Sequence, residues 1–113
     1  MKLKFLSFLT FITLILFNFA MAQPCGKITG SVLDETKKPL DGATVILLAA
    51  KDSTVVSSQL VNRDGSFAFQ NLKDNIYQIR ATYIGFKNYQ SSNVVVRGQK
   101  PVDLPAFILS PAG

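Results

Sequence analysis

The chain has 113 residues, 12 basic and 7 acidic groups, one cysteine, and neither histidine nor tryptophan. This length allows at most one ordinary domain. The lack of histidine removes the usual general base and the commonest metal ligand, and a single cysteine excludes an intramolecular disulfide and a thiolate metal cluster. Most hydrolase and metalloenzyme classes are excluded on these grounds, and we expect no catalytic residue, no metal site and no cofactor.

Residues 1–22 have the pattern of an export signal. Two lysines among the first four residues precede an apolar stretch of 15 residues, and the small residues Ala20 and Ala22 fit an A-x-A cleavage site. An uncleaved membrane anchor is the alternative, but a spanning helix needs about 20 apolar residues. The pattern therefore predicts a signal peptide over residues 1–22, with cleavage before Gln23.

Residues 23–26 are expected to form a short N-terminal tail that contains Cys25. A lipoprotein signal would need small residues directly before the cysteine, whereas Gln23 and Pro24 precede it. We therefore expect a free thiol, which an oxidising compartment could cap or convert to an intermolecular disulfide.

Charge on the remaining 91 residues is modest, with 10 basic and 7 acidic groups. The basic residues are scattered singly except for Lys37 and Lys38. No stripe or cluster of bases is present of the kind that follows a phosphate backbone. We expect no nucleic-acid partner, and membrane contact only through the signal peptide or a parent protein.

Short alternating apolar patterns, separated by turn residues every 8–12 positions, predict an all-β fold with no helix after the signal. Seven such strands fit a Greek-key β-sandwich over residues 27–110, with residues 111–113 as a C-terminal tail or the start of a linker. The run Val45–Leu48 is apolar on both faces, which favours a central or covered strand. Pro105 favours an edge or bulge position for the last strand. The expected strands are Lys27–Leu33, Ala43–Ala50, Thr54–Val61, Ser66–Gln70, Ile76–Ile84, Asn88–Val96 and Leu104–Leu109.

Five residues between these strands are expected to shape the turns. Pro39 fixes its own φ, and Gly42 suits a turn that other residues disfavour. Asp64 followed by Gly65, between alternating segments, is a hairpin signal because glycine takes a positive φ without a Cβ penalty. Gly85 interrupts an alternating pattern as a bulge or a corner would.

Four motifs in a fixed order carry a family resemblance. They are Gly30–Asp34, Pro39–Val45, Asp64–Phe69 followed by Leu72 and Tyr77, and Tyr83–Phe86. The set resembles the carboxypeptidase regulatory-like domain over about residues 26–110. The resemblance implies a transthyretin-like (prealbumin-like) sandwich with seven strands.

A signal peptide directly before such a domain resembles the N-terminus of TonB-dependent outer-membrane receptors and related outer-membrane β-barrel proteins. In those proteins the domain lies in the periplasm, ahead of the plug and barrel. The resemblance implies an exported chain in the periplasm or on the periplasmic side of the outer membrane. Its partner would be a barrel or plug in cis, or another envelope protein. Because 113 residues encode neither plug nor barrel, we expect the head of a longer protein or a free-standing copy.

Two binding functions are compatible with these patterns. The first is a non-catalytic module that contacts another protein through an edge strand or the end loops. The second is glycan binding, in which an exposed ring stacks on a sugar beside amide groups. The candidates for such a glycan or partner contact are Phe86, Asn88, Tyr89, Gln90 and Asn93.

An enzymatic function is disfavoured. Transthyretin-like sandwiches include a ureide hydrolase that is built on histidine, which this chain lacks. The carboxypeptidase name refers to zinc enzymes whose separate catalytic domain is missing here.

Overall fold

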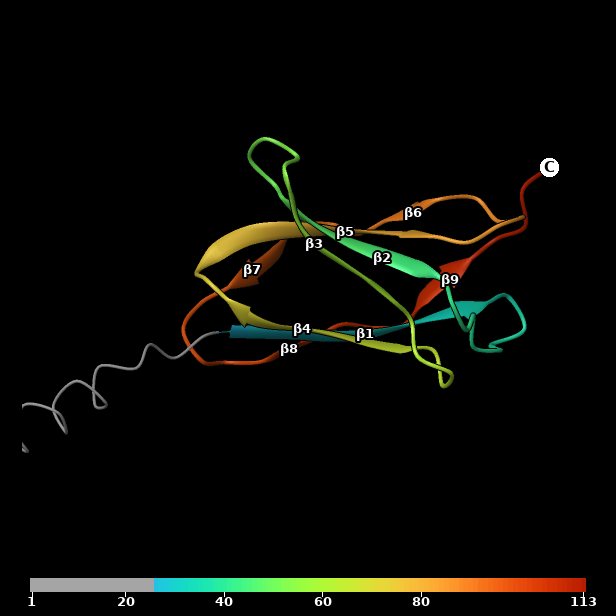
Figure 1. Cartoon of the computed structure of the whole chain (residues 1–113), viewed down its shortest axis with the longest axis horizontal. Helices are drawn as coiled ribbons and strands as arrows, with labels where there is room; N and C mark the ends of the chain where they lie inside the picture. Colours follow the sequence, from blue (N-terminus) through green and yellow to red (C-terminus); the bar gives the residue numbers. More distant parts are fainter. Residues whose placement is uncertain (1–25) are drawn as a thin grey trace, which may run out of the picture.

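The computed structural model describes residues 26–113, which form two β-sheets packed face to face (Figure 1). The predicted signal peptide, its cleavage residues Ala20, Ala22 and Gln23, and Cys25 lie outside the described residues. The expected all-β fold is confirmed for the described part, where the secondary structure consists of strands and turns. Within this part there is no helix with the length and apolar character needed to cross a membrane.

Nine strand segments build the two sheets. One sheet has the order β4-β1-β8, with β9 also paired to β1, and the other has the order β3-β2-β5-β6, with β7 also paired to β5. β8 and β9 run parallel to β1, while the other paired strands are antiparallel. The segments are β1 (Gly26–Asp34), β2 (Thr44–Ala49), β3 (Val55–Leu60), β4 (Ser66–Leu72), β5 (Asn75–Thr82), β6 (Tyr89–Gln90), β7 (Val94–Val96), β8 (Val102–Asp103) and β9 (Phe107–Leu109).

The two expected strands nearest the C-terminus differ from the observed ones. The stretch expected as Asn88–Val96 forms β6 and β7, which pair with different parts of β5. The last expected strand, Leu104–Leu109, is shortened to β9, and β8 (Val102–Asp103) lies before it where no strand was expected; both segments pair with β1, on either side of Pro105. Proline has no N–H to donate to a ladder, so the break falls where the sequence cannot sustain pairing. The nine segments therefore occupy seven strand positions.

The core lies between the sheets and centres on Phe67 of β4. Its ring centroid lies 5.8 Å from that of Phe69 and 5.6 Å from that of Phe107. Gly30 faces Phe67 across the β1–β4 ladder, and a Cβ atom on Gly30 would lie 2.5 Å from the Phe67 ring. Because Gly30 has no side chain, the Phe67 ring can pack directly against its backbone. The largest fully buried side chains are Phe67, Ile28, Leu47, Ile79, Leu109, Val32, Val45 and Val96.

Three turns are held by an aspartate that accepts the peptide N–H two residues ahead. The N–O distances are 2.8 Å from Thr36 to Asp34, 3.1 Å from Thr54 to Asp52 and 3.0 Å from Ser66 to Asp64. In each turn, a hydrogen bond from the Thr or Ser side chain is the main cause that lowers the pKa of the aspartate. Such turns fix where each strand begins and ends.

The hairpin expected at Asp64–Gly65 is wrong, because this turn connects β3 to β4, which lie in different sheets and pair with β2 and β1. The predicted turn glycines nevertheless adopt left-handed backbone. The φ angles are +84° at Gly42, +84° at Gly65 and +87° at Gly85. At Gly65 the space is also restricted, since a Cβ atom would lie 3.0 Å from the carbonyl oxygen of Val32. Pro39 lies opposite Leu33 in an isolated bridge, on the loop that leads to Gly42.

Candidate functional site

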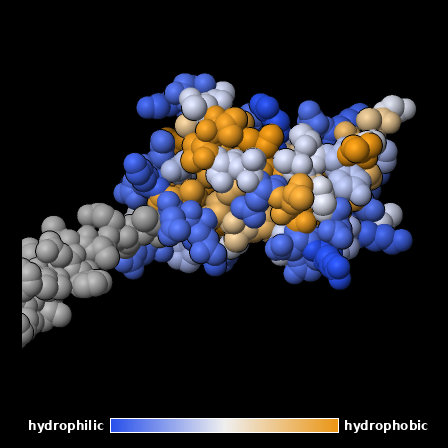
Figure 2. Space-filling view, viewed as in Figure 1, coloured by the Kyte–Doolittle hydropathy of each residue, from blue (hydrophilic) through white to orange (hydrophobic). Residues whose placement is uncertain are grey.

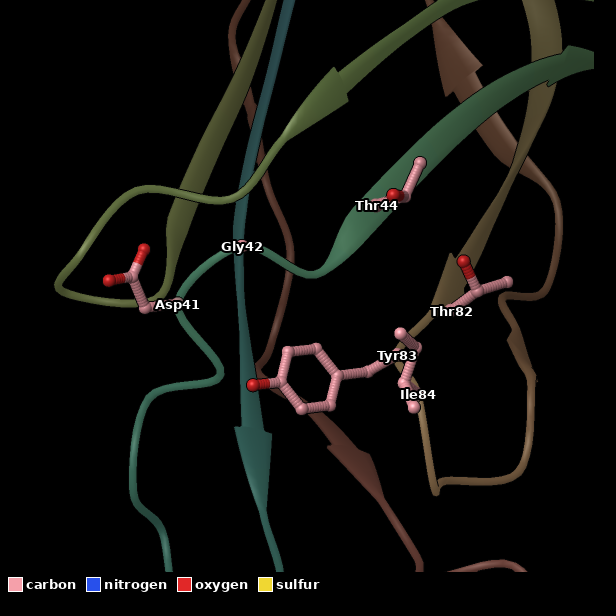
Figure 3. A pocket seen from close by; sticks show the side chains of 6 residues that line it. All are labelled: Asp41, Gly42, Thr44, Thr82, Tyr83 and Ile84. Atoms are coloured by element: carbon pink, nitrogen blue, oxygen red, sulfur yellow. The ribbon is translucent and has the colours of Figure 1, made fainter.

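An open hollow of about 680 Å³ lies where β2 begins and β5 ends (Figure 3). Thr44 and Thr82 are opposite each other in the β2–β5 ladder, so their side chains are neighbours on one face of the sheet. Figure 3 shows the ring of Tyr83 reaching from the end of β5 toward Gly42. The hollow combines a carboxylate, three hydroxyls and an apolar side chain. Its lining residues are Asp41, Gly42, Thr44, Thr82, Tyr83 and Ile84.

Ile84 is the most exposed large apolar residue of the described chain, with 96% of its surface accessible. It belongs to a turn that the peptide N–H of Phe86 closes by donating to the carbonyl of Tyr83 at 3.0 Å. The rings of Tyr83 and Phe86 pack edge to face, with centroids 5.6 Å apart. The turn is therefore anchored by two aromatic rings while it presents Ile84 to solvent.

The same turn lies beside the last residues of the chain. The peptide N–H of Lys87 donates to the carbonyl of Ser110 at 2.8 Å, and that of Ala112 donates to Gly85 at 2.9 Å. Phe86 and Pro111 form an isolated bridge between these two hydrogen bonds. Residues 110–112 are thus fixed against the turn that carries Ile84.

The two aromatic residues of the predicted contact set pack toward the core. The ring of Tyr89 stacks on buried Phe107 with centroids 4.6 Å apart, and Phe86 packs on Tyr83. Both rings are half-buried and lie against the core cluster. In this arrangement, neither ring lies fully open to a ligand.

Two amides of the predicted contact set, Gln90 and Asn93, are hydrogen-bonded to Gln78 of β5. The Gln78 side chain donates to Asn93 at 2.9 Å, and the Gln90 side chain donates to Gln78 at 3.0 Å. Asn88 is exposed on the segment before β6. The five predicted residues therefore divide between a core-packed aromatic group and an exposed amide group.

A second surface, not identified from the sequence, is the edge strand β3. The accessible surface is 62% at Val55, 47% at Val56 and 65% at Leu60. Figure 2 shows apolar surface over this side of the sandwich. The sequence predicts a half-polar strand at Thr54–Val61, but such a pattern does not distinguish a strand at the edge of a sheet from an interior strand with one face buried.

The hollow was also missed, because its lining residues come from two segments far apart in the sequence. The 76–84 alternation places Ile84 within a strand, whereas β5 ends at Thr82. Gly85 was the available signal that the chain turns there. Within residues 26–113, no three acidic side chains gather closely enough to hold a metal ion.

The comparisons with known proteins concern the family and the fold. The sequence profile described as the carboxypeptidase regulatory-like domain matches residues 27–110. No curated protein matches the chain in sequence.

Solved structures with the same fold share little sequence with the chain. A chain of a type II cohesin–X-dockerin complex from Acetivibrio cellulolyticus has a TM-score of 0.60 and 15% identity, over 76% of this chain and 58% of that one. The 5-hydroxyisourate hydrolase of Klebsiella pneumoniae has a TM-score of 0.58 and 22% identity, over 77% of this chain and 92% of that one. A protein from Bacteroides uniformis that is named as carbohydrate binding has a TM-score of 0.55 and 19% identity, over 78% of this chain and 42% of that one.

At these identities the likeness concerns the fold alone. The chain spans 58% of the length of the cohesin–dockerin chain and less than half of the Bacteroides protein.

Proposed function

The chain belongs to the carboxypeptidase regulatory-like family, and we propose that it is an exported, non-catalytic β-sandwich module that acts by contact with another protein. Its partner is an outer-membrane barrel or plug, in the same polypeptide or bound to it, or another envelope protein. The module then works in the periplasm or on the periplasmic side of the outer membrane. The export pattern of residues 1–22 and the absence of histidine support this proposal.

The observation that carries the proposal is the exposed Ile84 on its anchored turn. Burial of an isoleucine side chain is worth about 1.5–3 kcal/mol. A residue already held in place loses little freedom when a partner covers it, so more of that gain is retained on binding. A plug or barrel that followed in the same polypeptide would begin beside Ile84, because residues 110–112 run along its turn.

Site-specific photocrosslinking tests the proposed contact. A photoreactive residue placed at Ile84, in cells that express the exported chain, should give an adduct with an outer-membrane protein or with the barrel part of its own polypeptide. Gln70 is the matched control, because it is exposed on β4 in the other sheet. The proposal fails if position 84 gives no adduct, or if positions 84 and 70 give the same adducts.

Cell fractionation with N-terminal sequencing tests the export. The proposal expects a chain that begins at Gln23 and is recovered with the periplasm or the outer membrane. A chain that keeps residues 1–22 and stays in the cytosol would contradict it.

Glycan binding is the second candidate, and the lining of the hollow favours it. The carboxylate of Asp41 and the hydroxyls of Thr44 and Thr82 are groups that hydrogen-bond sugars, and Tyr83 adds a ring. Calorimetric titration with a panel of oligosaccharides tests this function. Heat that Asp41→Ala and Thr82→Ala both abolish would support it, and no heat across the panel would dispose of it.

A further inference from the structure

The strand β3 is an edge of the five-stranded sheet, and the ladder fixes which of its peptide groups face outward. The peptide N–H of Val61 donates to Ala43 at 2.8 Å, on the β3 side of β2. The N–H of Ala50 donates to Ile76 at 2.9 Å, on the β5 side. Because antiparallel ladders alternate, odd-numbered residues of β2 bond to β3 and even-numbered residues bond to β5.

Two residues of β3 therefore direct their peptide groups away from the sheet. Ser58 and Leu60 lie opposite Ile46 and Thr44, which are even-numbered residues of β2. Their N–H and C=O groups point to the free edge, beyond which the described chain places no further strand. A strand added to this edge could form hydrogen bonds with the N–H and C=O groups of Ser58 and Leu60.

The side chains of β3 do not protect the edge as native edge strands usually do. Monomeric proteins commonly place charges, proline or a very short strand at such an edge. The ten residues from Ser53 to Asn62 contain neither a charge nor a proline, and β3 has six residues. A register irregularity against Leu47 and Leu48 of β2 affects only the start of the strand, which leaves Ser57–Leu60 regular.

The adjacent edge of the other sheet is the strand β4, and one of its carbonyl groups already accepts a hydrogen bond from β3. The side-chain amide of Gln59 donates to the carbonyl of Ala68 on β4 at 2.7 Å. This bond ties the two sheets together and occupies an acceptor of β4. The β4 edge therefore lacks one free acceptor, at Ala68.

Apolar and polar side chains of β3 are arranged symmetrically about Ser58. Val56 and Leu60 are apolar at equal distances on either side, and Ser57 and Gln59 are polar. A two-fold antiparallel pair places each residue opposite its counterpart across the axis, so a strand with this symmetry is complementary to itself. The turns before and after β3 each carry one base and one acid, so two copies meet without excess like charge.

We propose that two copies of this chain pair through β3, antiparallel, about a two-fold axis at Ser58. The peptide groups of Ser58 in one copy bond to those of Ser58 in the other, and Leu60 of one copy faces Val56 of the other. The two five-stranded sheets then join into one continuous sheet. This interface is distinct from the turn at Ile84, so both contacts can form at once.

Analytical ultracentrifugation of the purified exported chain over a range of concentrations tests the pairing. The wild-type chain should sediment as a dimer that dissociates on dilution. Ser58→Lys and Ser58→Glu should each raise the dissociation constant at least tenfold, because each places two like charges at the axis. An equimolar mixture of the two variants should associate again. Ser92→Lys, at an exposed position near the opposite edge, is the control and should dimerise as the wild type does.

A disulfide trap gives a second measurement that needs no charge at the edge. With Cys25 changed to serine, Ser58→Cys should form an interchain disulfide on mild oxidation, because directly opposed residues in a hydrogen-bonded pair bring their Cα atoms to about 5.5 Å. Ser92→Cys should not. The proposal is overturned if the wild-type chain is monomeric at millimolar concentration, if Ser58→Lys remains dimeric, or if the two charge variants fail to associate when mixed.

Discussion

The two edges of the five-stranded sheet are built in different ways. On one edge, β6 and β7 are segments of two and three residues, and the gap between them is closed by Ser91. The hydroxyl of Ser91 accepts the peptide N–H of Ile79 at 2.8 Å, and the N–H of Ser91 donates to the Ile79 carbonyl at 2.8 Å. On the other edge, β3 has six residues with exposed apolar side chains and free peptide groups at Ser58 and Leu60.

The β6–β7 edge is protected against pairing with another strand, whereas the β3 edge is open to it. Short, interrupted strands offer too few aligned peptide groups to template another chain, whereas a longer uncharged strand does offer them. We therefore expect the β6–β7 edge to stay unpaired and β3 to be the edge that binds a second copy. This contrast can be tested by substitutions that should have unequal effects in the two regions and in the core.

The largest difference is expected between the core and the β3 edge. Phe67→Ala should lower the free energy of unfolding by about 3–5 kcal/mol, because it removes a buried ring. Leu60→Ala should change it by less than about 1 kcal/mol, since the Leu60 side chain is largely in solvent. Urea unfolding of both variants in dilute solution, where the proposed dimer is dissociated, measures this. Equal losses would mean that β3 is part of the core rather than an open edge.

The turn that connects β3 to β4 should be the next most sensitive position. Gly65→Ala should cost about 2 kcal/mol or more, because it combines left-handed backbone with a Cβ atom 3.0 Å from a carbonyl oxygen. Gly42→Ala has the same φ but open space around it, so the expected cost is about 1 kcal/mol. Thermal unfolding of the two variants separates the backbone strain from the contact. A larger loss at Gly42 would mean that the contact at Gly65 adds nothing to the backbone strain.

A smaller difference is expected between the serines of the two edges. Ser91→Ala leaves the half-buried N–H of Ile79 without its acceptor and should cost about 1–2 kcal/mol. Ser58→Ala removes a hydroxyl for which the structure gives no hydrogen bond, and the change should stay within about 0.5 kcal/mol. Chemical denaturation of the two variants compares the edges directly. If both substitutions cost the same, the contrast between the edges is lost.

The smallest effect is a pH dependence at the turn after β3. Hydrogen bonds from the side chain and then the peptide N–H of Ser66 lower the pKa of Asp64 in the folded state. The unfolded pKa is higher, so this stabilisation is present above the unfolded value and is lost as the pH falls through the folded one. Ser66→Ala should therefore flatten the fall in unfolding free energy below about pH 4. An unchanged slope in that variant would remove Asp64 from the acid response.

Much of the fold followed from local patterns in the sequence. Strict alternation, as in the run from Tyr77 to Ala81, marks a half-buried strand wherever it occurs. The central place of β2 followed from Val45–Leu48, whose apolar residues on both faces need cover from both sides. The break between β6 and β7 did not follow, because Val94–Val96 continues an apolar pattern and only tertiary pairing with β5 divides it.

The surfaces were less predictable than the strands. The sequence gives the spacing of Phe86 and Tyr89 but not which face is covered, and both rings lie against the core cluster. Ile84 continues the alternating pattern of β5 in the sequence. It lies instead in the turn that Tyr83 and Phe86 close by a hydrogen bond, and this turn exposes its side chain. Gly85 and the uncharged stretch Ser53–Asn62 are the only local signals of the hollow and of the open edge, because each surface is defined by what the rest of the fold leaves uncovered.

Residue-resolved hydrogen exchange of the purified exported chain tests the central contrast most directly. In dilute solution we expect slow exchange at Ser57 and Gln59, which bond to β2, and fast exchange at Ser58 and Leu60. At high concentration the amides of Ser58 and Leu60 should become protected as a second copy covers the edge. Protection of these two amides at every dilution would contradict an open edge, and fast exchange at the highest concentration would contradict pairing through β3.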